Sequence, residues 1–202
     1  ATLGTLTVSE AKSLTSTNGD VTITAVDIDI QATSGTGTID AGTAAITIHG
    51  AKAEQTIGLG ATPKQMQITD SEMSRITALG GLSIGSSTSG SMTVDGLTLA
   101  GTDKVATLTL VATKSTMTVT LSGGRSTFQG LTVQTAHGVS VVNGLKATAL
   151  PVVLNAGSGT LTIADGKSVS TSNQFVTITA DALNLQGSAT VSAGTAALNI
   201  AS

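Results

Sequence analysis

The chain has 202 residues, of which 10% are charged, a net charge of −3, and no Cys, Trp or Tyr. Without Cys, a disulfide framework and a thiolate metal site are excluded. No basic stripe indicates nucleic-acid binding, and no apolar run reaches the roughly 20 residues that span a bilayer. Frequent Thr, Val and Ile with so little charge argue against disorder. We therefore expect an ordered β-protein.

The candidate core is aliphatic. Hydrophobic residues make up 40% of the chain, yet Phe128 and Phe175 are its only aromatic residues. A broad core normally takes several large aromatic side chains to fill. We therefore predict a thin, elongated molecule. The chain begins with Ala and shows no signal peptide, which we interpret as a processed protein or an excised segment.

Short apolar–polar–apolar triads recur along the chain, separated by Gly, Ser, Asp and Asn. The outer two side chains of such a triad lie on one face of a strand and the middle one on the other. Each triad is predicted to be a short strand that ends at a turn. In chain order the triads cover residues 21–23, 28–30, 46–48, 82–84, 92–94, 97–99, 108–110, 117–119, 131–133, 139–141, 161–163 and 176–178.

A long internal repeat organises these triads. Residues 4–25 align without a gap with residues 159–180, at an offset of 155 residues, and 12 of 22 positions are identical, including Lys12/Lys167 and Asn18/Asn173. The similarity continues, so that 4–48 is repeated at 159–200. This pattern predicts a tandem array with a unit of about 155 residues. An old duplication inside one self-contained domain is the alternative.

The fold class that fits best is all-β, a right-handed parallel β-helix (β-solenoid) over residues 1–202. A sandwich of this size would carry longer strands and larger core residues, whereas a solenoid needs only short strands around an aliphatic core. With coils of about 20 residues, the chain would form roughly ten coils spaced by about 4.8 Å. Right-handed winding follows the general preference of parallel crossovers.

Residues 45–99 carry a resemblance to a known family. Three pieces stand out, at Gln55–Gly60, Ile68–Ile76 and Ile84–Val94, which read QTIGLG, ITDSEMSRI and IGSSTSGSMTV. Together they resemble a segment of very large filamentous-haemagglutinin-like repeat proteins, and the flanking coils extend the resemblance over most of the chain. It implies secretion, a right-handed β-helical shaft and an adhesin or surface-fibre role. It implies no catalytic residues.

Residues 62–75 are the least regular part of the chain. Thr62 before Pro63 could cap a short helix, and Thr69-Asp70-Ser71-Glu72 matches a capping box. A protruding binding loop is one interpretation. We favour a local helical turn in which Glu72 and Arg75 form an ion pair three residues apart.

Isolated polar residues offer little chemistry. Asp27 and Asp29 lie on the polar phase of a strand, where paired carboxylates could cleave glycosides or hold Ca²⁺. In the second copy their positions hold Ala182 and Asn184, so a solvated face is the better interpretation. His49 and His137 are far apart and are predicted to be surface or turn residues.

Two rival functions remain at this point. Polysaccharide-cleaving or carbohydrate-binding proteins also use parallel β-helices, but their clefts need clustered carboxylates and aromatic platforms. An ice-binding solenoid would display Thr-x-Thr pairs as a flat array, yet none occurs between residues 39 and 106.

We expect a structural or adhesive shaft segment of a secreted repeat protein, extracellular or on the cell surface, and not an enzyme. No catalytic, cofactor-binding or metal-binding residue is expected. The expected partners are neighbouring repeats of the same chain, and surface glycans or other cells.

Overall fold

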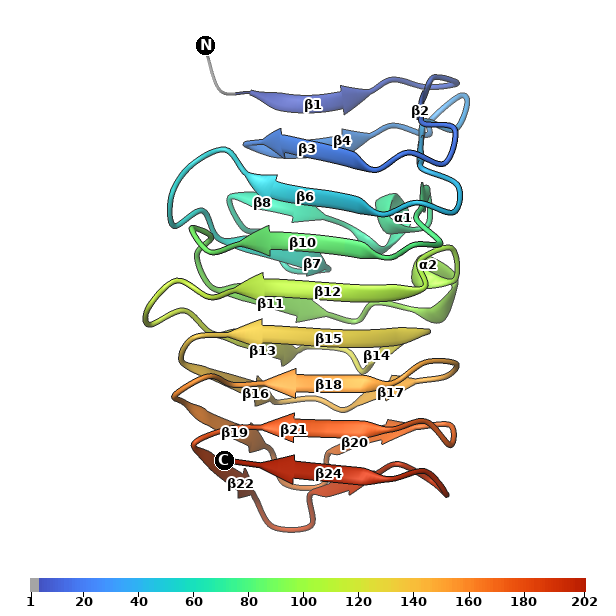
Figure 1. The fold of residues 1–202 in the computed structure, drawn as a ribbon. Coiled ribbons are helices and arrows are strands. Elements are labelled where there is room, and N and C mark those ends of the chain that lie inside the picture. Colours follow the sequence, from blue (N-terminus) through green and yellow to red (C-terminus); the bar gives the residue numbers. More distant parts are fainter. Residues whose placement is uncertain (1–3) are drawn as a thin grey trace.

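Short parallel strands stack into a right-handed β-solenoid of about nine turns, as the sequence predicts (Figure 1). The computed structural model describes residues 4–202. The coils stack in three sides, which we call the front sheet, the back face and the third side.

The front sheet has eight strands in chain order. Its strands are β3 (Val21–Ala25), β6 (Ile46–Gly50), β10 (Leu82–Ser86), β12 (Thr107–Ala112), β15 (Gly130–Thr135), β18 (Val152–Asn155), β21 (Val176–Thr179) and β24 (Leu198–Ala201).

The back face has a two-stranded and a seven-stranded sheet, and one of its neighbouring pairs reverses chain order. Its strands, from the N-terminal end, are β1 (Thr5–Val8), β4 (Asp27–Ile30), β8 (Met66–Ile68), β7 (Ile57–Gly60), β11 (Met92–Asp95), β13 (Val119–Ser122), β16 (Gly138–Val141), β19 (Thr160–Ile163) and β22 (Ala182–Leu185). The back face therefore holds one strand more than the front sheet.

The third side closes each coil with shorter strands and two single-turn helices, α1 (Asp70–Met73) and α2 (Leu99–Thr102). Its strands are β2 (Ser13–Thr15), β5 (Thr38–Asp40), β9 (Ile76–Thr77), β14 (Ser126–Phe128), β17 (Leu145–Ala147), β20 (Ser168–Thr171) and β23 (Thr190–Ser192).

The core lies between the three sides and is filled by the inward residues of each triad. In β4, for example, Ile28 and Ile30 are 2% and 1% exposed, whereas the intervening Asp29 is half-buried. Side chains alternate because successive residues of a strand point to opposite faces. Phe128 on β14 is fully buried, but Phe175 is 53% exposed, so a single aromatic ring enters an otherwise aliphatic interior.

The coils are longer than predicted. Successive front strands pair at offsets of 25, 36, 26, 23, 21, 24 and 22 residues. The coil length predicted from the sequence was based on the spacing of triads. It was too short because the strands of the third side contain few triads and were mostly missed. Longer coils explain why the chain makes about nine turns rather than ten.

Two predicted triads differ from the structure. The triad 97–99 is not a strand, because Thr98 caps helix α2 with its side chain accepting from the Gly101 N–H at 3.0 Å. The triad 117–119 overlaps the turn before β13, and only Val119 belongs to the strand.

Candidate functional site

A column of mostly hydroxyl side chains, interrupted by one Val and ended by one Asn, runs down the outer surface of the front sheet. The strand register aligns, from the N-terminal end, Thr22, Thr47, Ser83, Thr109, Thr132, Val153, Thr177 and Asn199. Strand spacing places neighbours in this column about 4.8 Å apart. The next outward column is mixed and reads Thr24, His49, Gly85, Val111, Gln134, Asn155, Thr179 and Ala201.

The Thr-x-Thr pairs do not form a double array. Those at 22/24, 107/109 and 177/179 lie on the front sheet, three strands apart, whereas those at 5/7, 118/120 and 160/162 lie at the back face. On the strand after β3, the partner of Thr24 is His49, and Thr24 Oγ1 lies 3.3 Å from His49 Nε2. The flat two-column surface that an ice-binding solenoid would need is interrupted on both sheets.

The irregular segment contains a doubled strand. The chain runs through β7, crosses back over residues 61–65, and forms β8 on the N-terminal side of β7, so that Ile57 pairs with Met66 in parallel. We call residues 61–65 the strap. The strap lies against the outer side of Gly58, where a Cβ atom would meet the Thr62 carbonyl oxygen at 2.0 Å. Gly58 is therefore required for the crossing.

The predicted capping box and local helical turn are confirmed, but the cap at Thr62 and the ion pair between Glu72 and Arg75 are not formed. Thr69 Oγ1 accepts from the Glu72 N–H at 3.2 Å, and Glu72 Oε2 accepts from the Thr69 N–H at 2.8 Å, which closes the first turn of α1. Residues around Thr62 and Pro63 are not helical, because they belong to the strap.

The side chains of Glu72 and Arg75 bond to backbone rather than to each other. Glu72 Oε1 accepts from the Ile30 N–H at 3.1 Å, and Arg75 donates to the Ile30 carbonyl oxygen and to Ser71 Oγ. Ile30, at the end of β4, pairs with Val8 of β1 on one side, and these two side chains replace the strand partner that it lacks on the other. Their spacing in sequence could not reveal this contact, because Ile30 belongs to the previous coil.

Asp27 and Asp29 also have local partners. Asp27 Oδ1 accepts from the Gln67 N–H of β8 at 2.9 Å, and Asp29 Oδ2 accepts from Gln31 Nε2 at 3.0 Å. Both carboxylates are half-buried. Asp27 thus links β4 to β8, which are neighbouring strands that belong to separate sheets. Its role in this geometry is structural.

His137 is exposed in the turn before β16, beside a shallow depression of about 350 Å³ on the back face. Hydroxyl groups line most of this depression. They belong to Thr118, Thr120, Ser140, Ser158, Thr160 and Thr162. Adjacent strands supply these residues, so the lining is a regular feature of the coil surface.

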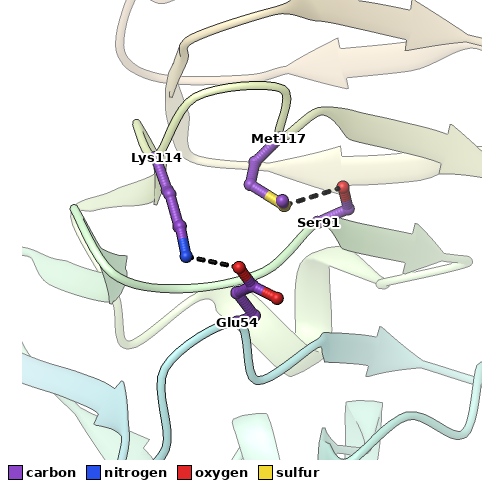
Figure 2. Close-up of polar contacts among 4 residues, drawn as sticks. All are labelled: Glu54, Ser91, Lys114 and Met117. Atoms are coloured by element: carbon purple, nitrogen blue, oxygen red, sulfur yellow. Dashed lines mark hydrogen bonds and ion pairs between the residues drawn. The ribbon is translucent and has the colours of Figure 1, made fainter.

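The turns that follow β6, β10 and β12 form a polar stack (Figure 2). Lys114 bonds to Glu54 across the intervening turn, and Ser91 Oγ lies 3.6 Å from Met117 Sδ. The side-chain hydrogen bond from Lys114 and its charge hold the pKa of Glu54 below its ordinary value. Exposed pairs of this kind add little stability.

A second carboxylate joins consecutive turns near the C-terminal end. Asp165 Oδ1 accepts from the Ser188 N–H at 2.7 Å and from Ser188 Oγ at 3.0 Å. The backbone hydrogen bond from Ser188 is the main cause that lowers the pKa of Asp165.

Within residues 4–202, no group of three or more His, Asp or Glu side chains is placed to hold a metal ion. The helices of the same residues are too short to cross a bilayer. Neither family models, curated proteins nor solved structures show a match to this chain.

Proposed function

We propose that the chain is a shaft segment of a longer, secreted repeat protein, and that it has a structural or adhesive rather than a catalytic role. One observation carries the proposal. The repeated sequences 4–48 and 159–200 occupy equivalent places in the stack, with β1 to β6 matching β19 to β24 in order and in side. The stack can therefore repeat its own beginning without a change of cross-section.

The match extends to single side chains. Asn18 and Asn173 both have positive φ, at 58° and 59°. Each Oδ1 accepts from a backbone N–H of the next coil at 3.1 Å, from Thr43 and Thr195 respectively. The side chains of both copies thus join successive coils in the same way.

Such a stack suits a load-bearing spacer. Strand pairing joins successive coils without a break along the front sheet and over most of the other two sides, and stability grows by nearest-neighbour contributions. A 155-residue unit advances the front sheet by six strand spacings, from β3 to β21, which is about 29 Å at 4.8 Å each. Contacts with glycans or cells, repeated along such a fibre, would gain strength from avidity. We place this function outside the cell or on its surface.

The resemblance to filamentous-haemagglutinin-like proteins belongs to the same proposal. Its first two motif pieces lie in the coil that contains the strap and α1, and the third lies in the next coil, at the turn that contains Gly90. A Cβ atom at Gly90 would meet the Glu54 carbonyl oxygen at 2.4 Å, so the glycine of the TSG piece allows two turns to approach closely. The motif thus has a structural rationale in this chain.

Electron microscopy of longer stretches of the parent protein tests this proposal. Two and three units should give thin rods whose lengths increase by about 3 nm per unit. Rods of constant length, or separate globules, would contradict the shaft.

A carbohydrate-binding module is the second candidate, favoured by the hydroxyl-lined depression beside His137. A glycan array and a reducing-end assay separate the two. The shaft predicts no saturable binding and no released sugar. Binding that is lost in Thr120→Val but kept in Thr109→Val, on the opposite sheet, would favour the second candidate.

A further inference from the structure

Sulfur in this chain is confined to four methionines, since the sequence has no Cys. Met66, Met73 and Met92 are 0%, 0% and 1% exposed, and all three belong to the core. Met117 is half-buried in the turn between β12 and β13, where its side chain packs against the edge of the core. Oxidants reach exposed sulfur first, so Met117 differs from the other three methionines in its access to solutes.

A hydroxyl group points at the Met117 sulfur. Ser91 lies one coil earlier, in the turn before β11, and its Oγ donates to Met117 Sδ across 3.6 Å (Figure 2). Ser91 Oγ itself accepts from the Thr118 N–H at 3.1 Å and from Thr118 Oγ1 at 3.4 Å. Because Thr118 supplies these two donors, the proton of the Ser91 hydroxyl is directed toward the sulfur.

The acceptor in this contact is a poor match for its donor. A thioether sulfur is a weak hydrogen-bond acceptor. Oxidation of methionine to the sulfoxide places a polar oxygen on the sulfur. Donors linked in a chain, as Thr118 and Ser91 are, polarise one another and bond more strongly to a polar acceptor. The Ser91 hydroxyl therefore suits the oxidised side chain better than the reduced one.

The turn can take up an oxygen atom without opening. The Met117 N–H donates to the Lys114 carbonyl oxygen at 3.1 Å, and the Met117 carbonyl oxygen accepts from the His137 N–H at 3.2 Å. These backbone bonds do not involve the side chain. The side chain is unbranched, with three rotatable bonds, so a sulfoxide oxygen can turn toward Ser91. In the fully buried methionines the same oxygen would enter an aliphatic interior without a partner.

We propose that Met117 is a modification site, at which a peroxide oxidises Sδ to the sulfoxide and Ser91 Oγ then donates to the new oxygen. A lone pair of the sulfur attacks one oxygen of the peroxide, so that an S–O bond forms as the O–O bond breaks. Sulfur loses two electrons and the peroxide is reduced. With hydrogen peroxide, the departing hydroxide takes up the proton of the transferred oxygen and leaves as water.

The modified side chain would strengthen a contact between successive coils. Ser91 and Met117 belong to neighbouring turns of the polar stack, and their contact is a weak one while the sulfur is reduced. The inference goes beyond the shaft proposal and does not depend on it, because both residues lie within one copy of the unit and rod lengths do not enter the experiment.

The experiment treats the full chain with hydrogen peroxide and follows oxygen uptake by mass spectrometry. Trypsin places Met66 and Met73 in peptide 65–75, Met92 in peptide 76–104 and Met117 in peptide 115–125. In the folded chain Met117 should react at least about ten times as fast as the others, whereas in urea all four should react at similar rates. Met117→Leu is the matched control and should take up no oxygen over the same time. Equal rates in the folded chain, or equal uptake by Met117→Leu, would overturn the proposal.

The role of Ser91 is tested by thermal melting before and after oxidation. Oxidation should lower the melting temperature of Ser91→Ala by roughly 2–4 °C more than that of the wild type, the size expected for one hydrogen bond in a chain of this length. Each protein serves as its own reference, so any loss of stability from the substitution itself drops out. Equal changes in the two proteins would show that Ser91 does not hold the sulfoxide oxygen.

Discussion

Replacement of Gly58 by Ala tests whether the strap fixes the doubled strand. The new Cβ would lie 2.0 Å from the Thr62 carbonyl oxygen and 3.0 Å from Lys64 Cγ. The lysine side chain can rotate away, but the carbonyl belongs to the backbone of the strap. Since an ordinary carbon–oxygen contact is about 3.4 Å, the strap must move outward by more than 1 Å.

The expected cost follows from two opposing effects. Overpacking of this kind costs about 1–3 kcal/mol. Gly→Ala also restricts the unfolded chain, which stabilises the folded state by about 0.4–1 kcal/mol. We therefore expect Gly58→Ala to lower the free energy of unfolding by about 1–2 kcal/mol.

Urea unfolding and hydrogen exchange measure the effect. With a slope of about 2–3 kcal/mol/M, the urea midpoint should fall by roughly 0.5 M. Exchange should accelerate over residues 61–68 before it does so elsewhere. Gly4→Ala is the control, because its Cβ would meet no atom within 4 Å and its stability should be unchanged or slightly raised. Equal stability of Gly58→Ala and wild type, with unchanged exchange, would refute the role assigned to Gly58.

Three further predictions concern single side chains. Phe128→Ala should lower the free energy of unfolding, measured in urea, by about 3–5 kcal/mol. Phe175→Ala changes an exposed side chain and should lower it by less than about 1 kcal/mol. Similar losses for the two variants would contradict the packing described. Asn173→Ala should lower the free energy of unfolding by about 1–2 kcal/mol, because Ala loses the hydrogen bond to the next coil and is strained at positive φ. Asn173→Gly relieves the strain and should recover part of this loss. If it recovers nothing, the positive φ does not contribute. Because the pKa of Glu54 is lowered in the folded state, ionisation of this carboxyl group adds to the free energy of unfolding above the ordinary Glu pKa of about 4.3. This contribution is lost as the pH falls through the lowered pKa. Melting curves of Glu54→Gln should therefore approach those of wild type as the pH is lowered step by step below the ordinary Glu value, and a difference that does not shrink would exclude this cause.

The alternation of residues within triads predicted the short strands, and their length together with the aliphatic core favoured the solenoid over a sandwich. In Val21-Thr22-Ile23 and its counterparts, the aliphatic residues face inward and the polar residue faces outward, as the two-residue period of a strand requires. The capping box at Thr69 was also readable, since all its groups lie within four residues. Patterns that depend on local geometry were therefore predictable.

Features that depend on contacts between coils were not predictable. The bonds of Glu72 and Arg75 to Ile30 join positions more than 40 residues apart, so a favourable local spacing suggested an ion pair that does not form. The doubled strand was missed for a similar reason. Gly58 gave the one local signal, because a glycine in the middle of a strand pattern often marks a close approach of backbone.

The reversed order of β7 and β8 affects how the solenoid can unravel. In most coils, a strand that detaches from the end of the stack is paired with a neighbouring strand on one side only. Peeling from the C-terminal side instead reaches β8 while it is still enclosed by β7 and β4, and peeling from the N-terminal side reaches β7 between β8 and β11. From either direction the next strand to detach is held on both flanks. Unravelling that starts at one end should therefore halt at this coil, which makes it an arrest point within the solenoid.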